Sequence, residues 1–208
     1  MAALLLLASC AQTGGRRSTG SLDDGLLQYI DEASRAEIQD ARMTLMEASD
    51  QRAAAEYRVE HANGDRGVLK AEKRAASEKV KLERERVAAM TDVETGTEAP
   101  QEAQDALTSA VRELTAAENR IELHEAQAEV LKAELALAKA EEDHAEAVVN
   151  VWKARAIKDL GNEESSAIDV FAYESEEHEC TTEIEIAKIR LWSAQTKVQN
   201  LEDQLAAE

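Results

Sequence analysis

The stretch that decides the fold is residues 107–159, LTSAVRELTAAENRIELHEAQAEVLKAELALAKAEEDHAEAVVNVWKARAIKD. With Leu107 as position a of a heptad, thirteen of the sixteen a and d positions are apolar, and the exceptions are His124, Glu142 and Asp159. The apolar positions are Leu107, Ala110, Leu114, Ala117, Ile121, Ala128, Leu131, Leu135, Ala138, Ala145, Val149, Trp152 and Ala156. A seam sustained over so many heptads is typical of a coiled coil. We therefore expect one long helix over about 101–160 that packs along a neighbour.

The overall composition also favours long helices over a compact globular core. The 208 residues are 32% charged and only 3% aromatic, with a single proline. Such chains form helices that bury a seam, so we expect no deep enclosed pocket. The net charge of −19 argues against nucleic-acid binding, which needs clustered Lys and Arg. After residue 10, no stretch approaches the roughly 20 apolar residues of a membrane-spanning helix.

Two helical segments are predicted before the central stretch. Ser21 and Asp24 resemble a capping box that opens a helix over about 22–62. The stretch 63–67, NGDRG, contains two glycines, which cost about 2 kcal/mol relative to alanine inside a helix. We therefore predict a kink or short break there, followed by a segment over 68–92. The apolar stripe of the first segment is Leu27, Ile30, Ile38, Ala41, Leu45, Ala48, Ala55, Val59 and Ala62.

A last helix is predicted over about 167–207, after the stop signal Gly161-Asn162. Its seam is apolar except at Glu177, and Cys180 occupies a d position. We therefore interpret Cys180 as a small buried hydrophobe. The seam is Val170, Tyr173, Glu177, Cys180, Ile184, Ala187, Leu191, Ala194, Val198, Leu201 and Leu205.

The helix lengths and short turns predict an elongated all-α fold, formed by a single domain over 22–208. Short turns make consecutive helices antiparallel. We expect a three-helix bundle at one end, from which a two-helix hairpin projects. Charge favours this pairing, because residues 66–90 carry a balance of +4 and residues 101–134 a balance of −5. A second interpretation is that the basic run binds an acidic partner.

The N-terminal MAALLLLASC is an apolar run that ends in small residues, as secretory signals do. Leu7-Ala8-Ser9-Cys10 closely resembles the lipobox of bacterial lipoproteins. The resemblance implies that residues 1–9 are a signal peptide and that Cys10 becomes the lipidated N-terminus. Since no Lys or Arg precedes the leucines, we expect the natural start to lie upstream of Met1, or the given chain to be truncated.

Residues 10–21 contain a Gly/Ser/Thr-rich stretch, which predicts a flexible tether after the lipid anchor. Several acyl chains on one residue, palmitate among them, anchor a protein stably. In lipoproteins, Asp directly after the cysteine resembles an inner-membrane retention signal. Ala11 stands there, which favours the outer membrane, with the protein facing the periplasm.

A second resemblance covers residues 154–205, which look like the helical hairpin repeat of outer-membrane efflux channel proteins. This resemblance implies an accessory or relative of an export assembly. A further alternative is a cytoplasmic coiled-coil structural protein in which Leu-Ala-Ser-Cys arose by chance. An upstream start codon followed by Lys or Arg would favour the lipoprotein.

The polar residues suggest no catalytic, cofactor or metal site. Glu141 and His144 have the Glu-x-x-His spacing of di-iron bundles, but such a site needs a second pair, which is missing. His144 falls at position c, where we expect it to face solvent. His124 lies twenty residues away and faces nearly the opposite direction. His178, two residues before Cys180, diverges from it as well.

Three other features have both an ordinary and a functional interpretation. Residues 159–187 contain ten acids and no Lys or Arg, which predicts a solvated face or, alternatively, weak calcium binding. Trp152 lies at a d position and Trp192 follows a seam residue, so we expect core or inter-chain packing, with ligand stacking as the alternative. The function we expect is a non-enzymatic, lipid-anchored spacer, scaffold or adaptor. It contacts a membrane through Cys10 and a protein partner, or a second copy, through its coiled coil.

Overall fold

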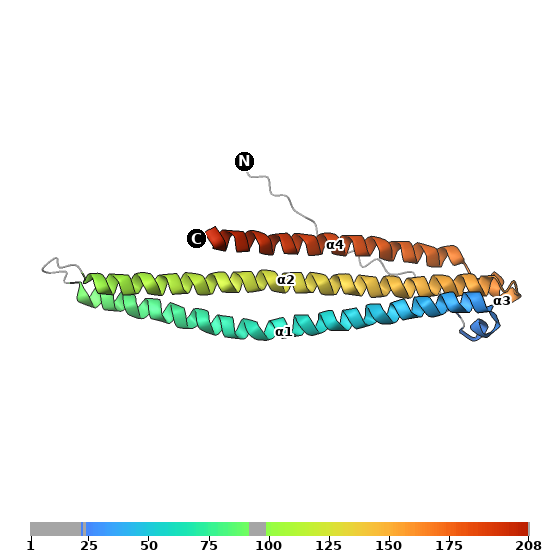
Figure 1. Ribbon diagram of the computed structural model, residues 1–208, viewed down its shortest axis with the longest axis horizontal. Coiled ribbons are helices and arrows are strands. Elements are labelled where there is room, and N and C mark those ends of the chain that lie inside the picture. The colour runs from blue at the N-terminus through green and yellow to red at the C-terminus, as the bar shows by residue number, and fades with distance from the viewer. Residues whose placement is uncertain (1–21, 23, 92–98, 208) are drawn as a thin grey trace, which may run out of the picture.

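The computed structural model describes residues 22, 24–91 and 99–207. The elements are a 3-10 helix η1 (Asp24–Tyr29) and the helices α1 (Glu32–Met90), α2 (Gln101–Lys158), α3 (Glu163–Ser166) and α4 (Val170–Ala207). No strand occurs among these residues, and the elongated all-α fold is confirmed (Figure 1). None of the described helices is long and apolar enough to cross a membrane.

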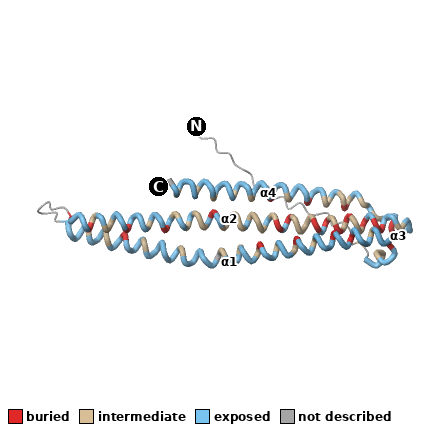
Figure 2. The backbone as a smooth tube through the Cα atoms, in the orientation of Figure 1, coloured by how far each residue is buried: buried red, intermediate tan, exposed pale blue. Residues whose placement is uncertain are grey.

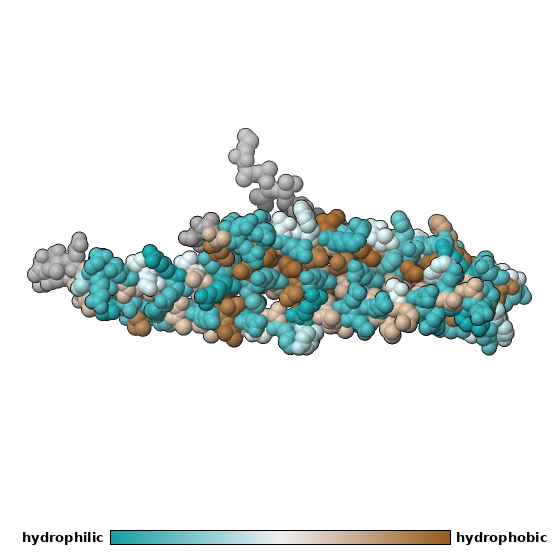
Figure 3. Space-filling view, viewed as in Figure 1, coloured by the Kyte–Doolittle hydropathy of each residue, from teal (hydrophilic) through white to brown (hydrophobic). Residues whose placement is uncertain are grey.

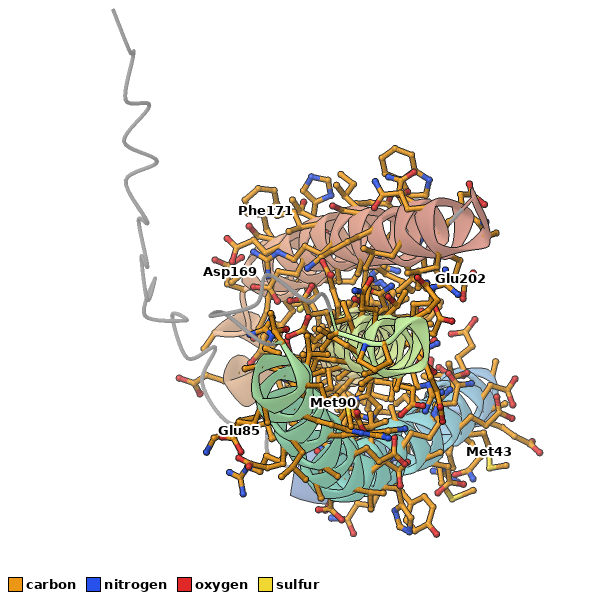
Figure 4. All side chains as sticks on the ribbon, turned by 90° about the vertical axis from the view of Figure 1, so that its left-hand side faces the viewer. Met43, Glu85, Met90, Asp169, Phe171 and Glu202 are labelled. Carbon is orange, nitrogen blue, oxygen red and sulfur yellow. The ribbon has the colours of Figure 1, made fainter. Side chains whose placement is uncertain are left out.

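The long helix α2 lies in the middle of the molecule, with α1 along one side and α4 along the opposite side (Figures 1 and 4). The ion pairs Arg66–Glu125 at 2.6 Å and Lys79–Glu113 at 2.6 Å show that α1 and α2 run antiparallel. With 58 residues, α2 is about 87 Å long. The protein is therefore a rod of three helices side by side.

The two-helix hairpin projects where α4 ends. Lys197 of α4 lies 2.8 Å from Glu129 of α2, and α4 ends ten residues later, at Ala207. Because the two helices are antiparallel, that end lies beside about residue 119 of α2. Among the described helices, the first 18 or so residues of α2 therefore contact only α1, which confirms the predicted hairpin. We call this part the distal tip.

α2 can pack on both sides because it carries two apolar seams. The a and d positions face α1, as predicted. A second seam at positions c and f faces α4, and two of its members, Val151 and Ala154, pack against Tyr173. The second seam is Ala126, Val130, Ala133, Leu137, Ala140, His144, Ala147, Val151 and Ala154. In the distal tip the c and f positions are mostly polar, which is why α4 has no surface to cover there.

The predicted break at residues 63–67 is wrong, because α1 is helical without interruption from Glu32 to Met90. Gly64 and Gly67 are both exposed. Their low helix propensity costs about 2 kcal/mol together, and tertiary contacts can outweigh this cost. Arg58 before the glycines and Arg66 between them supply such contacts, through Glu134 at 3.0 Å and Glu125 at 2.6 Å.

The predicted start of the first helix near residue 22 is also wrong. Residues 24–29 form the 3-10 helix η1, and α1 begins at Glu32. Asp31 caps α1 by accepting the backbone N–H of Ser34 at 2.8 Å, and this hydrogen bond lowers the pKa of the Asp31 carboxyl. Asp24 instead accepts a hydrogen bond from Lys153 on α2. Ser21, the other half of the expected box, lies outside the described residues.

The core is concentrated at the end where all three helices meet (Figure 2). One cluster joins Ile30 and Ile38 to Ala156, with Leu27, Trp152 and Leu160 packed against it. A second joins Val151, Ala154 and Tyr173, with Leu22, Ile168 and Val170 beside it. We call this end the three-helix end. Leu22, the first described residue, packs at this end.

We predict that Gly64→Ala and Gly67→Ala will each raise the free energy of unfolding by about 1 kcal/mol. A Cβ at either glycine would meet no atom within 4 Å, so the gain in helix propensity is not offset by a clash. Gly161→Ala is the matched control, since its φ of +65° suits glycine and alanine there should destabilise by about 1 kcal/mol. Urea unfolding measures all three. A loss of stability at Gly64 would contradict a continuous α1.

Candidate interaction surfaces

The two cysteines differ in what the structure can test. Cys10 lies outside the described residues, so its lipidation stays a prediction. Cys180 forms no disulfide among the described residues, is only 2% exposed, and lies in the seam that faces α2. The interpretation of Cys180 as a small buried hydrophobe is confirmed.

The histidines are not gathered at one place. His144 does not face solvent as predicted, because position c belongs to the second seam. Its Nε2 lies 3.4 Å from Glu177 Oε1 across the α2–α4 contact. In the described part of the chain, no three His, Cys, Asp or Glu side chains come together as a metal site would require.

The distal tip is held by ion pairs across an alanine-rich contact. Lys73 lies 3.1 Å from Glu118, and Lys79 lies 2.6 Å from Glu113. Farther along the same contact, the guanidinium of Arg66 lowers the pKa of Glu125. A shallow groove of about 420 Å³ opens between α1 and α2 here, because small side chains fill the contact incompletely. Its lining includes Ala75, Ala76, Ala116 and Ala117, with Glu72, Lys79, Glu113 and Arg120.

The basic run of α1 is only partly neutralised within the chain. Arg66, Lys73 and Lys79 pair with α2, which supports the charge argument from the sequence. Four others are exposed and form no ion pair within the described part of the chain: Lys70, Arg74, Lys81 and Arg84. They lie on one side of α1, next to the seam. A contribution of this side to binding an acidic partner remains a prediction.

The acidic stretch after α2 contributes to the contact between helices. Glu174 pairs with Arg155 of α2 at 2.6 Å, and Glu177 faces His144. Glu179 and Glu183 are exposed on the flank of α4. These acids therefore divide between the α2–α4 contact and the surface.

Large apolar side chains on the surface are the most distinctive feature of this protein. Of its six aromatic residues, four are at least 60% exposed. Two of these, Phe171 at 76% and Trp192 at 68%, lie on α4, together with the exposed Ile186 and Ile189. Figure 3 shows apolar side chains along the outer edge of α4 as well as between α4 and α2. Trp192 thus points away from the intramolecular seam. The heptad pattern had assigned no role to this outer face.

Comparison of the chain with protein-family models, with curated proteins and with solved structures found no match.

Proposed function

We propose that the protein is a lipid-anchored helical spacer and adaptor of the bacterial cell envelope, without catalytic activity of its own. The observation that carries the proposal is the rod itself. Its central helix spans about 87 Å, and Leu22, the first described residue, packs at the three-helix end. A lipid on Cys10 would hold that end near a membrane and direct the distal tip away from it.

The distribution of stability along the rod supports this assignment. The buried clusters gather at the three-helix end, next to the proposed anchor, where a tethered rod must resist bending. The tip consists of two helices joined by exposed ion pairs, which contribute only about 0.2–1 kcal/mol each. Such a tip can rearrange its side chains around a partner with little loss of folding free energy.

The exposed aromatic residues support the adaptor half of the proposal. Aromatic side chains are enriched where proteins bind one another, and they carry a large share of the binding energy. An enzyme would instead gather polar groups in a concave site, and the described surface offers chiefly convex helix faces. The preferred location is the outer membrane, facing the periplasm, as suggested by Ala11 after Cys10.

The anchor is tested by expressing the precursor, preceded by a basic n-region, in a bacterial host. We expect the protein to sediment with membranes and its N-terminal peptide to carry the mass of a lipidated cysteine. Cys10→Ser should abolish both properties, whereas Cys180→Ala, the matched control, should leave both unchanged. A wild-type protein that stays in the soluble fraction without lipid would favour the cytoplasmic coiled-coil alternative.

A further inference from the structure

The outer face of α4 is a stripe without formal charge. Phe171 and Ile189 each lie nine residues from Cys180, which is buried against α2. Nine residues correspond to about two and a half helical turns, so both side chains project to the opposite side of the helix. Figure 4 shows Phe171 on this outer side. The stripe consists of Phe171, Ser175, His178, Thr182, Ile186, Ile189 and Ser193, all exposed.

The spacing of the stripe is the same from either end. The intervals between its members are four, three, four, four, three and four residues, with Thr182 at the centre. A helix face with this symmetry can pack antiparallel against a second copy of itself, around a two-fold axis at Thr182. Such an isologous contact uses the same surface on both subunits and therefore closes at a dimer.

The side-chain sizes along the stripe also fit a second copy. In this arrangement Phe171 lies opposite Ser193, and Ser175 lies opposite Ile189. Large residues opposite small ones let two helices interdigitate. Trp192, at the edge of the stripe, then lies beside Phe171 of the second copy. The two most exposed aromatic residues of α4 therefore meet at both ends of the contact.

The charges beside the stripe favour the antiparallel orientation. Acids flank the stripe as far as residue 185, and bases flank it from residue 188 onwards. The acids are Glu174, Glu179, Glu183 and Glu185, and the bases are Lys188, Arg190 and Lys197. Antiparallel packing around Thr182 places Arg190 opposite Glu174 of the second copy and Lys188 two residues from it, and Glu185 opposite Glu179, whereas parallel packing places every charge beside its own copy. Charge complementarity of this kind sets the orientation of paired helices.

We propose that α4 is a self-association helix, which pairs through Phe171, Thr182 and Ile189 with α4 of a second copy in antiparallel orientation. This inference deepens the proposed adaptor function. It rests on that function only in taking α4 to be a protein-binding helix. From Phe171 to Ser193 the contact is about 33 Å long, which is small for a protein interface. We therefore expect a dimer that dissociates at micromolar concentrations.

Disulfide cross-linking at the symmetry axis tests the geometry. Thr182→Cys places a thiol next to its own copy, since facing helix axes lie about 8–10 Å apart. Thr196→Cys is the matched control on the same face, and both threonine hydroxyls donate to the carbonyl four residues earlier. Residue 196 lies about 21 Å along the helix from the two-fold axis, and therefore about 42 Å from residue 196 of the second copy. Both variants carry Cys10→Ser, so the result does not depend on lipidation.

Under mild oxidation at micromolar protein, we expect Thr182→Cys to form disulfide-linked dimers about a hundredfold faster than Thr196→Cys, because contact raises the effective thiol concentration to millimolar. Equal rates would mean either random collision or parallel pairing, and faster linkage of Thr196→Cys would mean another register. Either result would overturn the proposal.

Sedimentation equilibrium of the Cys10→Ser protein provides a second measurement that needs no added thiol. Ile189→Glu places two charges in the dimer contact and should give a monomer. Leu82→Glu is the matched control, because Leu82 on α1 is 63% exposed, close to the 65% of Ile189. The control should dimerise like the parent. A parent that is monomeric up to millimolar concentrations, or equal behaviour of the two variants, would contradict the proposal.

Discussion

Ile157→Ala is expected to lower the free energy of unfolding by about 2–5 kcal/mol. Ile157 near the end of α2 is fully buried, and it is the largest side chain in the described protein to be so. Its replacement removes apolar contacts and leaves a cavity that the surrounding helices can fill only in part. Chemical denaturation followed by circular dichroism measures the change.

Ile189→Ala is the matched control for this loss. The substitution is the same, but the Ile189 side chain is 65% exposed in the monomer. Below the concentration at which copies associate, we expect its effect to stay within about 0.5 kcal/mol. If both variants lost equal stability, the stability of the rod would not reside in the buried side chains of the three-helix end.

Ala154→Glu is expected to cost about 3 kcal/mol or more and to release α4 from α2. Ala154 belongs to the second seam, is 0% exposed and packs against Tyr173. A carboxylate there would lie between two helices without a partner, and a buried unpaired charge is among the most destabilising changes known. Limited proteolysis should then cut within α4 while α1 and α2 stay intact.

Ala136→Glu is the matched control, because Ala136 on the same helix is exposed. We expect it to leave both stability and the cleavage pattern of α4 unchanged. If Ala154→Glu behaved like this control, positions c and f could not be the surface on which α4 packs.

The seams were the part of the fold that the sequence could predict. Apolar residues at positions a and d of α2 do face α1, and the seam of α4, including Tyr173 and Cys180, does face α2. Periodicity reports which side of a helix avoids water, and an ion-pair ladder such as Lys73–Glu118 then sets the partner and its direction. These two signals were enough for an elongated rod with a projecting hairpin.

The second seam of α2 could also have been found from the sequence. Positions c and f become apolar from Ala126 onwards, and a second stripe on one helix indicates a second neighbour. Without it, His144 was expected to face solvent, whereas it faces Glu177 at 3.4 Å. The same stripe indicates that α2, rather than another helix, is shared between the two contacts.

Local signals failed where tertiary contacts outweighed them. Gly64 and Gly67 have poor helix propensity, but α1 continues through them because α2 holds both flanking segments. Asp24 has the chemistry of a helix cap but pairs with Lys153, while Asp31 caps α1. A capping residue can be recognised in a sequence, but competition between two capping candidates depends on what each meets in three dimensions.

The exposed stripe of α4 cannot be recognised from the sequence alone, for a different reason. Phe171, Ile189 and Trp192 fall outside the seam, and an isolated exposed apolar residue is ordinary. The signal emerges only when buried positions such as Cys180 are known, because residues nine positions away then lie on one opposite face. A binding face on a helix can therefore be recognised only when the side that packs against the rest of the protein is known.

The shared central helix is tested most directly by hydrogen exchange along α2 of the wild-type protein. Residues 126–157 are covered by both α1 and α4, whereas residues 101–117 contact only α1 among the helices that the structure describes. We predict slow amide exchange over 126–157, and faster exchange over 101–117 together with residues 73–90 of α1. Equal protection along the whole of α2, or greater protection at 101–117, would contradict a three-helix end with a projecting two-helix tip.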